Sequence, residues 1–482
     1  MRKQTVLVVS SIFLFVLSSF AQGPVPGTAP APDRQSPALT SAQTPSLDSF
    51  NGSGTADPLV PGVVQLSLLD AIDRGLKHNL GLLLSQQQTD MARAQYRRQL
   101  SVLRPNISGT ASESVNQINL AAFGIPLPAG LTSPVIGPFG LFDVHASMNQ
   151  TLLDFNARNK VRAAAENEKT AKFTVQDARE LVVLVVGNQY LLTLANAARL
   201  ESAKAQFNTA QTIFQQAQDL KKAGVTAGID VLRAQVQMQA QQQRVLAAQN
   251  QYEQQKMSLA RTIGMPVSQQ FTLTDAVPYA AFPAMDLQEA LTHAYQRRPE
   301  YLAAQSRTRA AELAVKAAKG EALPTVEVNG QLGLLGPAPG SAEGVYVLSG
   351  GIHIPIFQGG KVKAEVAQAE VLWRQNQLQL ENLHSRIEFE IRSALLDVKT
   401  SDDQVQVAKQ QIVLAAEQLK ESQDRYAAGV SGSLEVVQSQ EAVAGANENQ
   451  IQALYLNNVA KLQLVRALGE AEQRTRAFLG GK

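Results

Sequence analysis

Residues 361–426 read KVKAEVAQAEVLWRQNQLQLENLHSRIEFEIRSALLDVKTSDDQVQVAKQQIVLAAEQLKESQDRY and contain neither Gly nor Pro. Apolar or small side chains recur in steps that alternate between four and three residues, the period of a coiled coil. They are Val362, Val366, Ala369, Trp373, Leu380, Leu383, Ile387, Ile391, Ala394, Val398, Val405, Ala408, Ile412, Ala415, Leu419 and Tyr426, with Asn376, Ser401 and Ser422 in the remaining positions. The stretch therefore predicts one helix from Lys361 to Tyr426, roughly 100 Å long at about 1.5 Å per residue.

The first half of the chain shows the same periodicity in two stretches. The outgoing stretch carries Leu200, Ala203, Phe207, Ala210, Phe214 and Ala217, and the returning one carries Val231, Ala234, Met238, Val245, Ala248, Tyr252 and Leu259. The small Ala side chains allow helices to approach closely, whereas the other faces are rich in Gln. Such helices suit a wall that is wetted on one side and packed on the other.

The two halves also share landmarks at fixed spacings. The distance is 219 residues for Ala71 and Ala290 and for Pro105 and Pro324, and 205 for Gly224 and Gly429 and for Gly264 and Gly469. We therefore predict two internal repeats, residues 63–270 and 285–470, followed by a C-terminal tail at 471–482. The difference of 14 residues between the two spacings predicts one longer loop in the first repeat, which we assign to 117–142.

Pro105 and Pro324 each end a helix, and alternating segments follow them. Val326, Val328, Gly330, Leu332 and Leu334 alternate with Thr325, Glu327, Asn329 and Gln331; Tyr346, Leu348, Gly350, Ile352 and Ile354 alternate with Val345, Val347, Ser349 and His353. The first half has Val144, Ala146, Met148 and Leu152 against His145, Ser147, Asn149 and Thr151, with a weaker partner in 105–116. Alternation alone fits a bilayer-spanning barrel and a half-buried soluble hairpin equally well.

The number of strands favours a barrel shared between chains. One chain offers four strands, whereas the smallest membrane barrels have about eight, and an open edge is not tolerated in lipid. Outside the N-terminal segment no run reaches the ~20 apolar residues of a spanning helix. In such a barrel we expect Val326, Val328, Leu332, Leu334, Leu348, Ile352 and Ile354 to point to lipid, and Glu327, Asn329, Gln331 and His353 to line water.

The N-terminus reads as an export signal. Arg2 and Lys3 precede an apolar run, and small residues end at Ala21, so residues 1–21 are predicted to be a signal peptide. Residues 22–62 are rich in Pro and predicted to be a disordered linker. Removal of Arg2 and Lys3 leaves 41 basic and 41 acidic residues, which gives no electrostatic reason to expect nucleic acid. The chain has no cysteine, which excludes disulfides, thiolate metal sites and a cysteine nucleophile.

Several motifs together resemble the TolC-type outer-membrane efflux protein family. They are the two prolines before the strands, Ile356-Phe357-Gln358-Gly359-Gly360-Lys361 at a strand-to-helix turn, Arg425-Tyr426-Ala427-Ala428-Gly429-Val430-Ser431 with Leu434-Glu435-Val436-Val437, and residues 223–232 in the first half. The resemblance implies an α+β membrane protein of the bacterial outer membrane that extends into the periplasm. It implies a homotrimer with a 12-stranded β-barrel, four strands per chain, that continues into a long α-helical coiled-coil tunnel. One departure is Asn156-Ala157, which stands where the second half has Gly359-Gly360.

No motif for catalysis or for a cofactor emerges. The five histidines are scattered, and His384 with Glu388, four residues apart on a helix, fits a solvated pair better than a metal site. We therefore expect no enzyme and no cofactor, and any energy for transport must come from another protein. The favoured function is a passive duct for small molecules that works with an inner-membrane pump and a periplasmic adaptor. The alternative is a periplasmic coiled-coil spacer without a pore; drugs, metals and a secreted polypeptide all stay open as cargo.

Two turns between long helices are the candidate sites. By resemblance, their tips meet the adaptor, through Gly224, Val225, Thr226, Ile229, Gly429, Val430, Ser431 and Leu434; a bare turn is the alternative. Asp230 and Glu435 each stand six residues after the turn glycine and are expected to form acidic rings at a periplasmic gate, although helix capping would also explain them. Tyr426 is expected to tie neighbouring helices together, through Asp230.

Overall fold

The computed structural model of the chain describes residues 46–124, 133–275, 279 and 285–478. These residues form two compact units. The sheet unit contains Arg104–Leu153 and Val326–His353, and the helical unit contains the other described residues. The predicted signal peptide, residues 1–21, lies outside the described residues.

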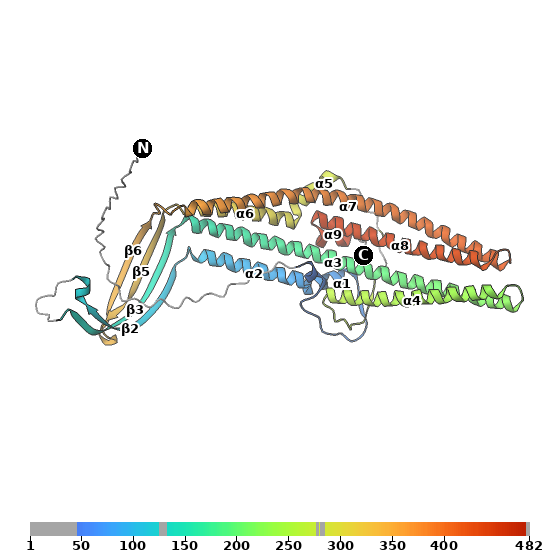
Figure 1. Cartoon of the computed structure of the whole chain (residues 1–482), viewed down its shortest axis with the longest axis horizontal. Coiled ribbons are helices and arrows are strands. Elements are labelled where there is room, and N and C mark those ends of the chain that lie inside the picture. Colours follow the sequence, from blue (N-terminus) through green and yellow to red (C-terminus); the bar gives the residue numbers. More distant parts are fainter. Residues whose placement is uncertain (1–45, 125–132, 276–278, 280–284, 479–482) are drawn as a thin grey trace, which may run out of the picture. The chain divides into compact units, whose positions relative to one another are not determined.

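Two helices dominate the helical unit (Figure 1). They are α3 (Phe155–Lys222) and α7 (Lys361–Ala427), of 68 and 67 residues, and α7 confirms the helix predicted from Lys361 to Tyr426. The others are α1 (Leu68–His78), α2 (Leu80–Ser101), α4 (Gly228–Thr262), α5 (Leu287–Arg297), α6 (Pro299–Gly320), α8 (Ser433–Leu468) and α9 (Ala471–Phe478). Strands β1 (Val64–Leu66) and β4 (Phe271–Leu273) pair in parallel, and η1 (Leu47–Asn51) is a short 3₁₀ helix.

The two long helices begin differently. Asp154 caps α3, because its side chain accepts a hydrogen bond from the Ala157 N–H. Helix α7 instead follows Gly359 and Gly360, whose φ angles of +59° and +88° lie in the left-handed region that favours glycine. The different residues in the two halves thus produce different strand-to-helix turns, as their sequences suggested.

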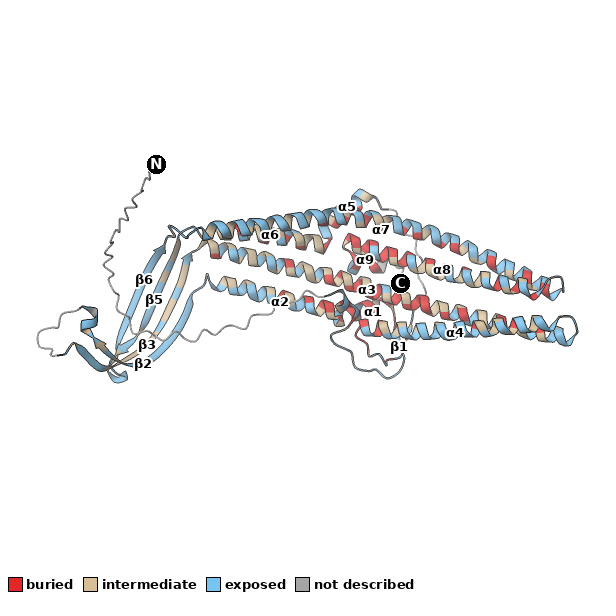
Figure 2. Ribbon diagram, viewed as in Figure 1, coloured by how far each residue is buried: buried red, intermediate tan, exposed pale blue. Residues whose placement is uncertain are grey.

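Neighbouring helices form an ordered layer. Helix α3 contacts α2 and α6, and α6 contacts α7; further along, α3 contacts α4 and α8, and α8 contacts α7. Every position of the predicted α7 seam is buried or half-buried, with Ile387 and Ile391 fully buried. Figure 2 shows the buried residues on the facing sides of the helices. Helices α2 and α4 on one side and α7 on the other are therefore the outer members of the layer.

One 18-residue window of α3 is apolar enough to cross a membrane by length and composition, with a mean hydropathy of 1.6. More than half of that window, 56%, is buried inside the chain. Val182, Val183, Val186 and Tyr190 of α3 belong to the main hydrophobic core. We therefore assign this stretch to the core of the helical unit.

The sheet unit has four strands in the order β2-β3-β5-β6. They are β2 (Asn106–Asn119), β3 (Val135–Leu153), β5 (Thr325–Gly336) and β6 (Glu343–His353). Strand β3 pairs antiparallel with both β2 and β5. Within one chain, β2 and β6 are the edge strands.

The strand register sorts side chains into two faces. Asn106, Asn149 and Asn329 align across three strands on one face, as do Ser108, Ser147 and Gln331. The opposite face carries Ile107 beside Met148, Ala146 beside Leu332, and Val144 beside Leu334. A Cβ added to Gly330 would lie 3.8 Å from Leu348 Cδ1, which places Leu348 on the apolar face. The predicted alternation is therefore present, and Leu332 is 68% exposed on its face.

The loop predicted at 117–142 is shorter in the structure than the sequence suggested. Strand β2 continues to Asn119, and β3 begins at Val135, so that Phe139, Leu141 and Phe142 pair with β2. An irregularity in the register between Asn116 and Ile118 lies opposite Pro138, which lacks the N–H that a regular ladder requires. Only residues 125–132 of that segment lie outside the described residues.

The linker predicted at 22–62 is also wrong in its described part. Residues 46–62 pack onto the helical unit because Phe50 is buried at 6% exposure and its carbonyl accepts a hydrogen bond from Asn79 Nδ2 at 2.7 Å. Asp57 forms an ion pair with Arg74. Likewise, the predicted tail at 471–482 contains α9, and Glu180 accepts hydrogen bonds from the Ala471 and Glu472 N–H groups at its start.

Candidate functional site

The two helix turns have the same backbone geometry. Gly224 and Gly429 have φ angles of +77° and +73°. The next residues, Val225 and Val430, donate their N–H groups to the Leu220 and Arg425 carbonyls at 2.9 and 3.0 Å. These bonds satisfy helix-terminal carbonyls while the chain reverses. Both turns therefore use glycine where the backbone takes a positive φ.

The tips expose apolar side chains. Val225, Ile229, Val430 and Leu434 are 65%, 52%, 71% and 56% exposed. Thr226 and Ser431 are half-buried beside them. Because such side chains are usually exposed singly, four at two adjacent turns form a candidate contact surface. Together with Gly224 and Gly429, these six residues are the eight that were predicted to meet the adaptor, and we call them the tip surface.

Asp230 connects the two turns. Its Oδ1 accepts a hydrogen bond from Ser433 Oγ at 2.6 Å and its Oδ2 accepts one from Thr226 Oγ1 at 2.9 Å. Arg233 lies 3.5 Å away, and the Asp230 side chain is only 17% exposed. The Ser433 hydrogen bond is the main cause that lowers the pKa of Asp230. Asp230 therefore carries a negative charge that holds the start of α8 beside the start of α4.

Glu435 occupies the equivalent position but has different surroundings. It lies 3.4 Å from Arg425, and its side chain is 43% exposed. Both acids lie in the first turn of a return helix, as predicted. The equivalence is thus positional, because only Asp230 is enclosed by hydroxyl groups.

Tyr426 lies in the same region without making the expected contact. Its side chain is buried, and its hydroxyl has no hydrogen-bond partner among the described residues. Burial is the main cause that raises the pKa of Tyr426; the nearby Thr226 hydroxyl opposes this effect, and the charge of Asp230 adds to it. Ser433, rather than Tyr426, bonds to Asp230 within the chain. No sequence pattern predicts this contact, because the two residues are 203 positions apart.

A small apolar core lies behind the turns. Ile213, Ala217, Ala234, Tyr426 and Val436 pack together, so α3, α4, α7 and α8 all contribute. Farther along, Glu441 of α8 accepts hydrogen bonds from Gln237 and Arg244 of α4 at 2.8 and 3.0 Å. The α3–α4 hairpin is therefore joined to the α7–α8 hairpin by apolar and polar contacts.

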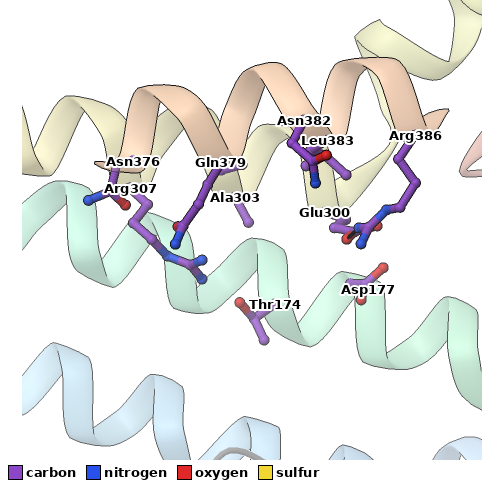
Figure 3. A pocket seen from close by; sticks show the side chains of 11 residues that line it. Thr174, Asp177, Glu300, Ala303, Arg307, Asn376, Gln379, Asn382, Leu383 and Arg386 are labelled. Carbon is purple, nitrogen blue, oxygen red and sulfur yellow. Dashed lines mark hydrogen bonds and ion pairs between the residues drawn. The ribbon is translucent and has the colours of Figure 1, made fainter. Parts of the chain in front are cut away.

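A groove of about 360 Å³ lies between α3, α6 and α7. Figure 3 shows Arg386 beside Glu300 at one end and Arg307 near Gln379 toward the other. Asp177 pairs with Arg466 at 2.7 Å, and Glu300 pairs with Arg298 at 3.1 Å. Because most charges are paired and Asn376, Gln379 and Asn382 add amide groups to the lining, the groove can hydrogen-bond a polar solute without a strong preference for its charge.

His384 and Glu388 do not converge on a metal position. The His384 ring stacks on Tyr295 with a centroid distance of 4.3 Å, and Glu388 pairs with Arg392 at 2.7 Å. Among the described residues, no group of three or more His, Asp or Glu side chains is arranged to hold a metal ion.

Comparison with known proteins gives one family. The profile described as "Outer membrane efflux protein" matches residues 71–265 and 290–470. The chain is 23% identical over 479 residues to the probable efflux pump outer membrane protein TtgC of Pseudomonas putida, with 95% of each chain covered. It is 22% identical over 470 residues to the cation efflux system protein CusC of Escherichia coli O157:H7, with 93% of this chain and 96% of the relative covered.

The fold is also similar to that of solved structures. A membrane protein from Pseudomonas aeruginosa superposes with a TM-score of 0.72 at 21% sequence identity. The match covers 84% of this chain and 91% of that protein. The two proteins therefore share a fold.

Proposed function

This chain belongs to the outer membrane efflux protein family, and from that premise we propose that it is the channel subunit of a tripartite efflux or export system. It is a protein of the bacterial outer membrane that extends into the periplasm. In this proposal it is a passive conduit for small molecules. A periplasmic adaptor and an inner-membrane pump complete the system, and the pump supplies the energy.

The observation that carries the proposal is the sheet with one apolar and one polar face. Leu332 and Leu334 expose apolar surface on one face, while Asn329 and Gln331 align with Asn149 and Ser147 on the other. A closed barrel puts the first face in lipid and the second in water. Since β2 and β6 are open edges, closure requires other copies of the chain.

The helical unit supports a ring of copies independently. Helix α7 exposes a row of large apolar side chains, which we call the α7 stripe: Val371, Leu378, Phe389, Leu396, Val407 and Leu414. Their spacing alternates between 7 and 11 residues, so the pattern repeats every 18 residues, or about five helical turns, and stays on one face. This face is separate from the buried seam that meets α8.

The opposite side of the helical layer offers a matching surface. Helix α2 exposes Leu84 and Met91, and α4 exposes Leu232, Val236, Leu246 and Met257. Two different edges that each expose apolar side chains fit head-to-tail contacts, which close into a ring when the rotation allows it. We propose a homotrimer with twelve strands, in which the α7 stripe packs on α2 and α4 of the next copy.

The helix turns have two roles in this proposal. The tip surface meets the adaptor, because its apolar side chains are exposed on rigid helices. Asp230, Glu435 and Tyr426 form the periplasmic gate, where three copies of each acid surround the axis. The hydrogen bond between Ser433 and Asp230 supports a closed arrangement of the two hairpins.

The rival function is a periplasmic spacer without a pore. A spacer would have the same helices, but its function would not require a sheet with one apolar face. Conductance in planar bilayers distinguishes the two functions, together with heat-dependent migration of the membrane-extracted protein on gels. We expect discrete channels and a heat-sensitive oligomer. A protein that is folded and purified from membranes but forms no channels would contradict the conduit.

A further inference from the structure

Helix α7 presents two different polar sides beside its contact with α8. Val405 is fully buried and packs with Ala453 of α8, and its neighbours in the sequence, Gln404 and Gln406, are both exposed. Because a helix turns by about 100° per residue, the two glutamines point to opposite faces of the layer of helices. The surroundings of each glutamine therefore describe one face of the layer.

The face that carries Gln404 is hollowed and rich in amide groups. A groove of about 430 Å³ lies there between α7 and α8, and Asp403 is the one charged residue in its lining. Across this groove, Asn449 Nδ2 of α8 donates a hydrogen bond to Gln411 Oε1 of α7 at 3.1 Å. The uncharged polar residues of the lining, which we call the amide face, are Thr400, Gln404, Gln411, Asn449 and Gln452.

The face that carries Gln406 is covered by other parts of the chain. Tyr279, which lies between β4 and α5 in the sequence, donates its hydroxyl to Asp402 Oδ1 at 2.8 Å and accepts a hydrogen bond from Gln406 Nε2 at 2.6 Å. His384 lies 22 residues, or about six turns, before Gln406 and so points to the same side of α7. Its ring stacks on Tyr295 of α5 with a centroid distance of 4.3 Å. If this face pointed into a conduit, Tyr279 and α5 would lie inside it.

The closure of the proposed ring assigns the inner face independently. Each copy contributes four helices in the order α4-α3-α8-α7, so a trimer has twelve. In such a ring the two neighbours of a helix lie about 150° apart on the inner side and about 210° apart on the outer side. Around α7, α8 lies at Val405, and the next copy lies at the α7 stripe, which includes Val407. Val407 is about 160° from Val405 on the side of Gln404 and about 200° on the side of Gln406, so Gln404 is on the inner side.

On the basis of the proposed homotrimer, we propose that the amide face lines the conduit. Amide and hydroxyl groups donate and accept hydrogen bonds without carrying a charge. This part of the conduit therefore accommodates polar solutes of either sign. Selection by charge is left to the gate at the helix turns, on the opposite side of the small apolar core that joins the two hairpins.

Single cysteines test the two faces, because the chain has no cysteine of its own. Gln404→Cys and its matched control Gln406→Cys are recorded in planar bilayers before and after addition of 2-(trimethylammonium)ethyl methanethiosulfonate, which attaches a cationic group to an exposed thiol. Three such groups around the conduit should lower the conductance of Gln404→Cys channels by about a third or more and weaken their preference for cations. Gln406→Cys should react to the same extent, as measured by the mass of the protein, and keep its conductance. Wild-type channels should not respond.

Gln411→Cys provides a second position on the amide face and should respond as Gln404→Cys does. A change in the conductance of Gln406→Cys channels, or unchanged conductance in both Gln404→Cys and Gln411→Cys, would overturn the assignment of the faces. Wild-type protein that forms no channels before any reagent is added would overturn the conduit itself. The two failures are therefore distinguishable.

Discussion

At the scale of single residues, the two turn acids show how similar positions acquire different properties. Asp230 is enclosed by two hydroxyl donors, whereas Glu435 is half-exposed beside Arg425. Because its pKa is lowered, Asp230 stays charged at a lower pH than an ordinary carboxylate does. The charge of Glu435 is partly neutralised by the guanidinium of Arg425. The Asp230 ring should therefore dominate the preference of the gate for cations.

The first prediction concerns ion selectivity. Wild-type channels should be narrow and cation-selective, and the double variant Asp230→Ala, Glu435→Ala should lose that selectivity. Of the single variants, Asp230→Ala should have the larger effect. Reversal potentials across a salt gradient in planar bilayers measure this. If the double variant kept the ion preference of the wild type, Asp230 and Glu435 would stabilise the helix termini only and would have no role in the gate.

The second prediction concerns pH. Because hydrogen bonding lowers the folded-state pKa of Asp230 below its usual value of about 3.9, its stabilising contribution is complete above that value and is lost as pH falls through the folded-state pKa. Wild-type conductance should stay constant down to about pH 4 and rise below it. In Ser433→Ala the rise should begin at higher pH. Coincident titrations of the two proteins would contradict the role of Ser433.

At the scale of helices and strands, periodicity predicted most of the architecture. The α7 seam could be predicted because every turn of a helix repeats the same local pattern. The extension of β3 to Val135 and the packing of residues 46–62 could not, because both depend on partners far along the chain. The bond between Ser433 and Asp230 was missed for the same reason.

The third prediction concerns the turn between α7 and α8. Gly429 has open space around its Cα, so a side chain there meets no neighbour, but its φ of +73° strains a β-branched residue by about 1–2 kcal/mol. Gly429→Val should therefore displace the tip and abolish export while oligomers persist in the membrane. Gly445→Ala, in an open helical position, should leave export intact. Export assays measure transport by the two variants, and membrane fractionation measures their oligomers. Normal export by Gly429→Val would contradict the proposed tip contact.

The fourth prediction concerns the sheet faces. Leu332→Arg places a charge on the proposed lipid face and should cost about 2–4 kcal/mol if the residue is near the middle of the bilayer. Asn329→Arg lies three residues away on the opposite face and should cost little. Folding into lipid vesicles, followed by urea titration, compares the two variants. Equal assembly would show that the faces are assigned wrongly.

At the scale of the whole molecule, the described part of the chain leaves two surfaces uncovered. Among the described residues, the sheet has two open edges, and the side chains of the α7 stripe are exposed. In the proposed trimer, the edges of the sheet and the α7 stripe each meet a neighbouring copy. The proposed trimer therefore rests on two independent parts of the fold.

The fifth prediction tests the ring contact. Val407 belongs to the α7 stripe, and Val413, with a similar exposure of 56% against 65%, points about 120° away from it on the same helix. Val407→Glu should prevent the trimer from forming, because it buries an unpaired charge between copies. Val413→Glu should leave the trimer intact. Native mass spectrometry in detergent counts the copies; trimers of Val407→Glu would contradict the proposed interface.

The two turns share a backbone geometry but differ in their side chains, and this difference has a consequence for the number of adaptor molecules that bind one channel. The proposed trimer would present six turns around its axis, alternating between the Val225-Thr226 kind and the Val430-Ser431 kind. An adaptor that distinguishes the two kinds saturates at three copies for each channel, whereas one that reads only their common backbone shape saturates at six. The mass of the saturated complex would thus reveal whether side chains or backbone geometry govern docking.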